Sequence, residues 1–200
     1  NLLVKSGVDR VLAMDLHSAQ TQGYFDIPCD HIYGSPVLVD HLAAQDLGEV
    51  VVVSPDVGGV ARARAFAKQM NGAPLAIIDK RRTGHNMAES LTVIGDVSGR
   101  TAILIDDMID TGGTICSGAK LLREQGATGV IACATHPVFS PPAIERLSVD
   151  GLFEQVVVTN SIPIASNHVF PQLHVLSVAN MLGEAIWRIH EESSVSSMFR

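Results

Sequence analysis

Three carboxylates and a glycine-rich turn lie close together near the middle of the sequence. Asp106 and Asp107 follow a short apolar run, Asp110 comes next, and residues 111–114 read Thr-Gly-Gly-Thr. The glycines let the backbone approach a ligand, and the first N–H groups of a following helix would point at it. The threonine hydroxyls add donors for a phosphate. The carboxylates would repel that phosphate unless they accept hydrogen bonds from sugar hydroxyls or face a metal ion. The pattern therefore predicts a site for a phosphorylated sugar.

An acidic loop that merely caps a helix is the simplest alternative, and residues 110–112 alone would fit it. The full run, from a branched apolar strand at residues 101–105 to a helix that stops at Gly126, favours the binding site. A Walker A loop is excluded, because Gly118 is followed by Ala119 rather than lysine.

A second loop repeats this logic. Asp56 follows an all-valine strand and precedes Gly58 and Gly59, which open an alanine-rich helix. A carboxylate can take Mg²⁺ while backbone N–H groups take phosphate oxygens, so this loop suits a diphosphate with a metal ion. The alternative is an ordinary Pro-Asp turn that caps the helix.

Three further side chains could act on a phosphate chain. His17 directly follows a strand, and the ends of other strands in this sequence carry phosphate-like loops, so we interpret it as a ligand and not as a structural histidine. Lys80 and Arg82 are two residues apart and point the same way if the chain there is extended. Two cations of this kind could stabilise the charge that spreads over phosphoryl oxygens in a transition state, although a solvated basic turn would look similar.

The elements that must position these residues alternate between strands and helices. Expected strands cover residues 8–16, 49–54, 75–78, 91–97, 101–105, 130–135, 156–159 and 174–178. They lack strict in/out alternation, which is typical of a parallel sheet covered by helices on both faces. We therefore predict an α/β fold, in which ligands bind beyond the carboxyl ends of the strands. The candidates that follow such strands are His17, Asp56, Lys80 and Asp106.

Composition and charge exclude several classes of partner. The net charge is −7 and no basic run is longer than residues 80–82, so we expect no nucleic acid partner. No apolar run approaches the length of a membrane span, so we expect no membrane partner. The cysteines, Cys29, Cys116 and Cys133, are odd in number and far apart, which is typical of reduced thiols in a cytoplasmic protein.

Several motifs in one order resemble the ribose-phosphate pyrophosphokinase (PRPP synthetase) family, on the type I phosphoribosyltransferase fold. They are Asp15-Leu16-His17, residues 20–28, residues 54–59, residues 79–82, the central run, residues 134–137 and residues 194–196. The resemblance implies transfer of the β,γ-diphosphoryl group of ATP to the 1-hydroxyl of ribose 5-phosphate, giving phosphoribosyl pyrophosphate (PRPP) and AMP. The nucleophile would be a substrate hydroxyl, so catalysis would come from alignment, metal and cations.

The resemblance also implies a role for each motif. His17 and Asp56 would hold Mg²⁺, and Gly58 and Gly59 would bind the transferred diphosphate. Lys80 and Arg82 would be catalytic, with Arg82 also contacting substrate. Ribose 5-phosphate would be bound by Asp106, Asp107, Asp110, Thr111, Gly112, Gly113 and Thr114. Ser194, Val195 and Ser196 would belong to a regulatory site for phosphate and ADP between subunits of a homo-oligomer, commonly a hexamer.

The family has two similar α/β domains, and the match implies that most of the first one is missing. The sequence begins at Asn1 without methionine and reads as a piece of a longer protein. Residues 1–32 would end the incomplete first domain, residues 33–180 would form the phosphoribosyltransferase-like domain, and residues 181–200 would return to the first. We expect this piece alone to bind ribose 5-phosphate and Mg²⁺ better than ATP, and it could be inactive.

Two other functions stay open. A catalytically silent regulatory subunit would keep the fold, but it would not need His17, Lys80 and Arg82. A salvage phosphoribosyltransferase would share the sugar-phosphate loop, but we would not expect it to carry residues 15–17 or the Lys80/Arg82 pair.

Overall fold

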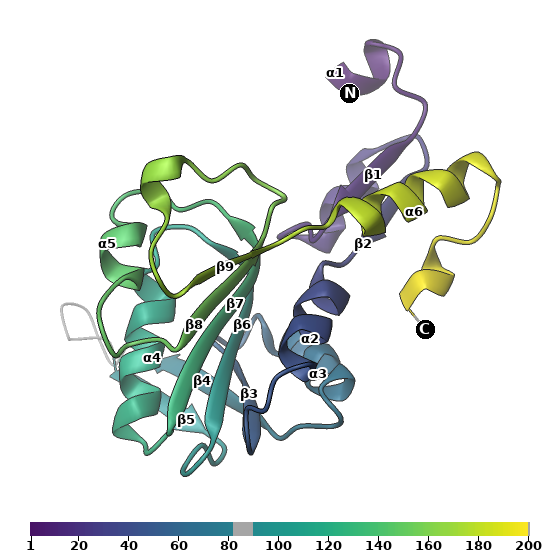
Figure 1. Cartoon of the computed structure of the whole chain (residues 1–200). Coiled ribbons are helices and arrows are strands. Elements are labelled where there is room, and N and C mark those ends of the chain that lie inside the picture. Colours follow the sequence, from purple (N-terminus) through teal and green to yellow (C-terminus); the bar gives the residue numbers. More distant parts are fainter. Residues whose placement is uncertain (82–89, 200) are drawn as a thin grey trace.

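The computed structural model describes residues 1–81 and 90–199, and its main body is a seven-stranded sheet (Figure 1). The strand order is β5-β4-β3-β6-β7-β8-β9, and every neighbouring pair is parallel except β4 and β5. The strands are β3 (Val50–Ser54), β4 (Leu75–Arg81), β5 (Ser90–Ile94), β6 (Thr101–Ile109), β7 (Gly129–Pro137), β8 (Gln155–Thr159) and β9 (Leu173–Leu176).

Helices cover both faces of this sheet. On one face, α2 (Ser35–Ala43) and α3 (Val60–Gln69) bury Leu38, Leu42 and Phe66 against it. On the other, α4 (Gly113–Glu124) and α5 (Ala143–Leu147) contribute an aliphatic core that includes Leu122 and Leu147. Figure 1 shows the two helix layers on opposite sides of the strands. The predicted parallel sheet with helices on both faces is therefore confirmed.

A smaller unit stands beside the main sheet (Figure 1). Strands β1 (Val11–Met14) and β2 (Cys29–Ile32) pair in parallel, and α6 (Ala179–His190) packs near them through a cluster that includes Ile32 and Ala185. The remaining elements are α1 (Leu2–Lys5) and the 3₁₀ helices η1 (Ala19–Tyr24), η2 (Ser166–His168) and η3 (Ser196–Phe199). The domain boundaries at residues 32 and 180 stay a prediction.

The structure corrects three sequence-based expectations. Strand β2 was not among the expected strands, because Cys29 to Ile32 carries polar residues. The strand is stabilised by pairing with β1. The expected strand over residues 8–16 is confined to β1. Strand β6 extends beyond residue 105 to Ile109, since β7 pairs with it over that length. Asp106 and Asp107 therefore lie inside a strand, not in the loop after it.

Candidate functional site

The predicted phosphate loop forms a complete strand–turn–helix unit. After β6, Gly112 adopts φ +72° and leads into α4, which begins at Gly113. A cavity of about 250 Å³ is lined by residues 108–115 and Asp106. Because the first N–H groups of a helix have no partner within it, α4 can donate hydrogen bonds to an anion bound there.

Helix α5 supports this loop from behind, which the sequence did not indicate. A Cβ at Gly112 would lie 3.6 Å from the Cα of Ala143 and 3.6 Å from Cγ of Leu147. Nη1 of Arg146 donates a hydrogen bond to the carbonyl oxygen of Thr111 over 3.0 Å. The left-handed turn is therefore held between α4 and α5, and it requires a residue that tolerates positive φ.

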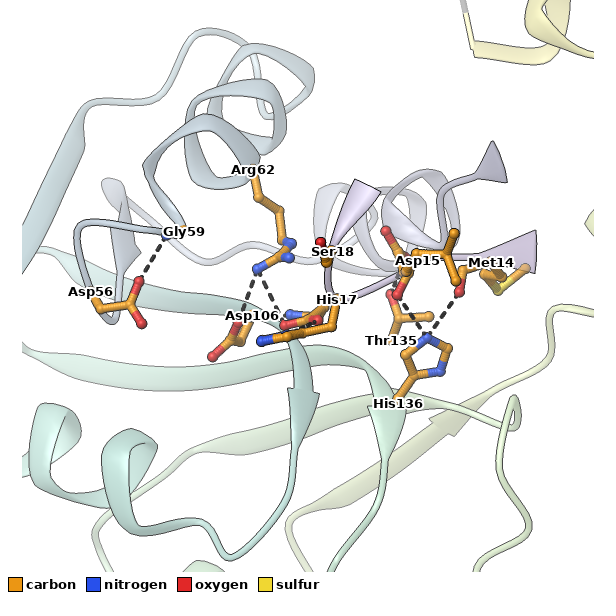
Figure 2. A network of polar contacts seen from close by, with 12 residues as sticks. Met14, Asp15, His17, Ser18, Asp56, Gly59, Arg62, Asp106, Thr135 and His136 are labelled. Carbon is orange, nitrogen blue, oxygen red and sulfur yellow. Dashed lines mark hydrogen bonds and ion pairs between the residues drawn. The ribbon is translucent and has the colours of Figure 1, made fainter. Parts of the chain in front are cut away.

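The two adjacent carboxylates of β6 have different surroundings, as neighbouring side chains of a strand do. Asp107 is buried and contacts Nδ1 of His17 over 2.8 Å through Oδ2. Asp106 accepts a hydrogen bond from Nη1 of Arg62 over 2.9 Å, and that nitrogen lies 3.4 Å from Oδ1 of Asp107. Figure 2 shows Arg62 reaching from α3 to Asp106, beside His17. Three elements distant in sequence thus meet at the end of β6.

The pKa values of the two carboxyl groups move in opposite directions. Burial, followed by the hydrogen bond with Asp107, raises the pKa of Asp106 to about 7, although Arg62 lowers it. Burial would also raise the pKa of Asp107, but the hydrogen bonds with Asp106 and His17 and the charge of Arg62 outweigh it, so that pKa is lowered. Near neutral pH, Asp107 is ionised and Asp106 is about half protonated.

We expect the Asp106→Asn variant to gain stability over the wild type as pH rises. Between about pH 4 and 7 the folded state keeps a proton on Asp106 that the unfolded chain has lost, so the wild-type free energy of unfolding falls across this window. The variant has no such proton and should gain on the order of 3 kcal/mol by pH 8. Urea unfolding of both proteins at pH 4.5 and pH 8 measures this difference in the free energy of unfolding. The first pH lies near the lower end of the window and the second lies above its upper end.

The exposed Asp150 provides the control, since its conversion to asparagine should leave the pH dependence unchanged. A difference between Asp106→Asn and wild type that stays constant with pH would contradict the raised pKa.

The second predicted loop is organised by Asp56. Its Oδ1 accepts a hydrogen bond from the N–H of Gly59 over 2.8 Å, and its carbonyl oxygen accepts one from the hydroxyl of Ser54. A Cβ at Gly59 would lie 2.9 Å from that Ser54 oxygen, so the close turn requires glycine. The turn occupies one carboxylate oxygen of Asp56, which is exposed, and the other can face a ligand (Figure 2).

His17 is arranged as a histidine that holds a cation would be. When Nδ1–H donates to the ionised Asp107, Nε2 keeps a free lone pair, and the side chain is 75% exposed. Within residues 1–81 and 90–199, no group of three or more His, Cys, Asp or Glu residues lies close enough to hold a metal ion. Mg²⁺ commonly takes only one or two protein ligands and completes its shell with water and phosphate oxygens. A Mg²⁺ ion shared by His17 and Asp56 therefore stays a prediction.

The predicted cations are only partly described. Lys80 is exposed near the end of β4, where it pairs with Leu91 of the antiparallel β5. Arg82 lies outside the described residues. Arg62 was not predicted as a site residue, although its place in the first turn after Gly59 was a usable signal.

The C-terminal tail reaches a second cavity through Phe199. Val195 is buried, and the hydroxyls of Ser194 and Ser196 lie 3.0 Å apart. Phe199 lines a cavity of about 480 Å³, together with His31, Tyr33 and Arg62. His17 and Asp106 line the same cavity, so it adjoins the cluster at the end of β6.

Over the described part of the chain, no helix has the length and apolar character needed to cross a membrane.

Comparison with known proteins adds three findings. The chain is 88% identical over its whole length to a ribose-phosphate pyrophosphokinase of Parasynechococcus marenigrum and 74% identical to that of Synechococcus elongatus. It spans 60% of the length of each.

A solved structure of phosphoribosylpyrophosphate synthetase from Mycobacterium smegmatis matches with a TM-score of 0.89 and 46% identity. The match covers 96% of this chain and 62% of that one. The resemblance inferred from the motifs is thereby confirmed. A family model described as "Phosphoribosyl synthetase-associated domain" matches residues 81–200, and the chain belongs to that family.

Proposed function

We propose that the full-length protein carrying this chain is a Mg²⁺-dependent ribose-phosphate diphosphokinase. It transfers the β,γ-diphosphoryl group of ATP to the 1-hydroxyl of ribose 5-phosphate, giving PRPP and AMP. The observation that carries the proposal is that the phosphate loop and the His17–Asp107–Arg62–Asp106 cluster meet at the end of one strand, β6. Relatives that are named for this activity and share most of the sequence support it.

The sugar phosphate binds at the start of α4. Backbone N–H groups of residues 112–114 and the hydroxyls of Thr111 and Thr114 donate to the 5-phosphate. Asp106 and the exposed Asp110 lie on the approach to the loop, and their carboxylate oxygens accept hydrogen bonds from ribose hydroxyls. Asp107 is buried and contacts His17 and Arg62, so it acts on this site through those side chains. This arrangement directs the 1-hydroxyl away from the phosphate loop and toward the rest of the cluster.

His17 and Asp56 would hold Mg²⁺, with Nε2 and the second carboxylate oxygen as the donors. When bound, the ion neutralises charge on the diphosphate. Gly58 and Gly59 let the backbone approach the transferred group at the start of α3. Lys80 and Arg82 act as cations on the transition state, and the ionised Asp107 keeps the His17 ring in the orientation required.

We extend the proposal to partners and place. The protein is a homo-oligomer, a hexamer by resemblance, and ADP or phosphate acts at Ser194, Val195 and Ser196. Exposed Ile186 and Trp187 on α6 support contacts with further protein. The free thiols of Cys29, Cys116 and Cys133 support a cytoplasmic location.

The experiment is AMP release from ATP, measured with and without ribose 5-phosphate, on the full-length protein and on this chain. Sugar-dependent AMP release by the full-length protein supports the proposal. If the full-length protein is silent, the chain belongs to a regulatory subunit. Release of diphosphate from PRPP when a purine base is added would instead indicate a salvage phosphoribosyltransferase.

A further inference from the structure

The two sheets are joined next to the candidate site. In the described part of the chain, β1 and β2 make one sheet and the other seven strands make another, so β1 is not a neighbour of β7 in a ladder. Side chains from the end of β7 nevertheless contact the last residues of β1 (Figure 2). His17 follows this end of β1 by only a few residues.

His136 makes the main contact between them. Its Nε2 lies 3.0 Å from the carbonyl oxygen of Met14 and 3.2 Å from that of Asp15. Carbonyl oxygens only accept hydrogen bonds, so Nε2 carries a proton and donates it to the end of β1. Its Nδ1 lies 2.9 Å from the hydroxyl of Ser161, which follows β8. The ring therefore makes contacts on both sides of the junction, through Nε2 to the end of β1 and through Nδ1 to the segment after β8.

Asp15 is held in an unusual conformation at this point. It has φ +42°, which is uncommon for a residue other than glycine, and its side chain is buried. Its carboxylate accepts hydrogen bonds from the N–H of Gly34 over 2.7 Å and from the hydroxyl of Thr135 over 2.5 Å. These hydrogen bonds to the Asp15 carboxylate stabilise the sharp turn that leads to His17. The hydrogen bond from His136 to the Asp15 carbonyl oxygen stabilises the same turn.

The direction of His17 depends on this turn. Its side chain is 75% exposed, so packing contributes little to its orientation. Its hydrogen-bond partner, Asp107, belongs to β6 of the main sheet, whereas His17 itself follows β1 of the small sheet. The 2.8 Å contact is kept only if the two sheets keep their relative position at this point.

We propose that His136 is a positioning residue that holds the end of β1 through Nε2 and thereby keeps His17 against Asp107. The inference rests on the proposed function for its kinetic consequence. The proposal gives different roles to the two hydrogen bonds of the His136 ring. The one from Nε2 positions the site, and the one at Nδ1 contributes only to the packing of β7 on the segment after β8.

Two substitutions of His136 separate the contacts of Nε2 from those of Nδ1 in the full-length protein. The amide of glutamine reaches about as far as Nε2, so His136→Gln retains a donor for the carbonyl oxygens of Met14 and Asp15. The amide of asparagine reaches only about as far as Nδ1, so His136→Asn retains a partner for Ser161 and loses the hydrogen bond to the end of β1. A third variant, Ser161→Ala, leaves the contacts of Nε2 in place. It removes the partner of Nδ1, together with the hydrogen bond from the Ser161 hydroxyl to the carbonyl oxygen of Thr135.

We expect His136→Asn to raise the Mg²⁺ concentration for half-maximal activity about tenfold, because it acts through the residue that orients a metal-holding histidine. The KM for ribose 5-phosphate should change less than about twofold, since the phosphate loop lies on α4. His136→Gln and Ser161→Ala should stay within about threefold of wild type in both quantities.

Hydrogen–deuterium exchange supplies a readout that needs no activity. In His136→Asn, amides of residues 11–18 should exchange faster, while those of β7 keep the wild-type rate. The proposal is wrong if His136→Asn and His136→Gln behave alike, if the defect falls on the KM for ribose 5-phosphate, or if β7 exchanges faster as well. A wild-type protein without activity would refute the proposed function, and the exchange experiment would still decide whether His136 holds β1.

Discussion

Replacing Lys80 with methionine in the full-length protein is expected to lower sugar-dependent AMP release about 10³-fold. Lys80 is exposed at the end of β4, so the change removes a charge at nearly constant length and should alter the free energy of unfolding little. The effect should fall on kcat, because the cation acts mainly on charge that develops in the transition state. Initial rates of AMP release at saturating ATP and ribose 5-phosphate measure it.

Lys68 is the matched control for this experiment. It is an exposed lysine in the last turn of α3, at the opposite end of that helix from the Asp56 loop, and Lys68→Met should keep the wild-type kcat. A loss of less than about tenfold in Lys80→Met would exclude a direct catalytic role for Lys80. A rise in KM with an unchanged kcat would mean that Lys80 binds substrate and transition state equally.

The second large effect is expected from Asp107→Asn, which should weaken activation by Mg²⁺ by about 10- to 100-fold. Asp107 is 1% exposed and holds Nδ1 of His17 over 2.8 Å, so loss of its charge makes the imidazole a weaker and less well oriented donor. The amide has nearly the same shape as the carboxylate and can still accept from the ring, so the protein should fold. Titration of AMP release with Mg²⁺ measures the change.

A double-mutant cycle with His17→Ala tests the cause. If Asp107 acts through His17, the two substitutions together should be hardly worse than His17→Ala alone. Additive losses would show that Asp107 acts on the substrate by another route. Asp150→Asn, an exposed change outside the site, should leave the Mg²⁺ titration as in wild type.

The parts of this protein that follow from local sequence were predicted correctly. The end of α4 before Gly126, where φ is +90°, was expected, because turn residues decide such features within a few positions. The strand–turn–helix unit at residues 101–124 is of the same kind. The parallel α/β arrangement also follows from the order and composition of the elements.

The contacts that complete the site are of another kind. His17 and Asp107 are 90 positions apart in sequence, and His136 and Met14 are 122 apart. No local rule reports which distant group a histidine will meet, so His136 could not be assigned. Arg62 had a local signal in its place after Gly59, but its contact with Asp106, 44 positions away, did not follow from that signal. Strand β2 was missed for the same reason, since its polar residues pair only when β1 lies beside them.

The sequence by itself determined the fold class, the strand–turn–helix unit after residue 101 and the family resemblance, because each depends on residues that are close along the chain. The tertiary structure alone decided how those pieces work together. Continuation of β6 through Asp106 and Asp107 gives two adjacent carboxylates opposite surroundings, and the junction at Asp15 and His136 brings a histidine from a separate sheet to one of them. Both outcomes depend on pairing and burial between distant segments, which only the folded chain establishes.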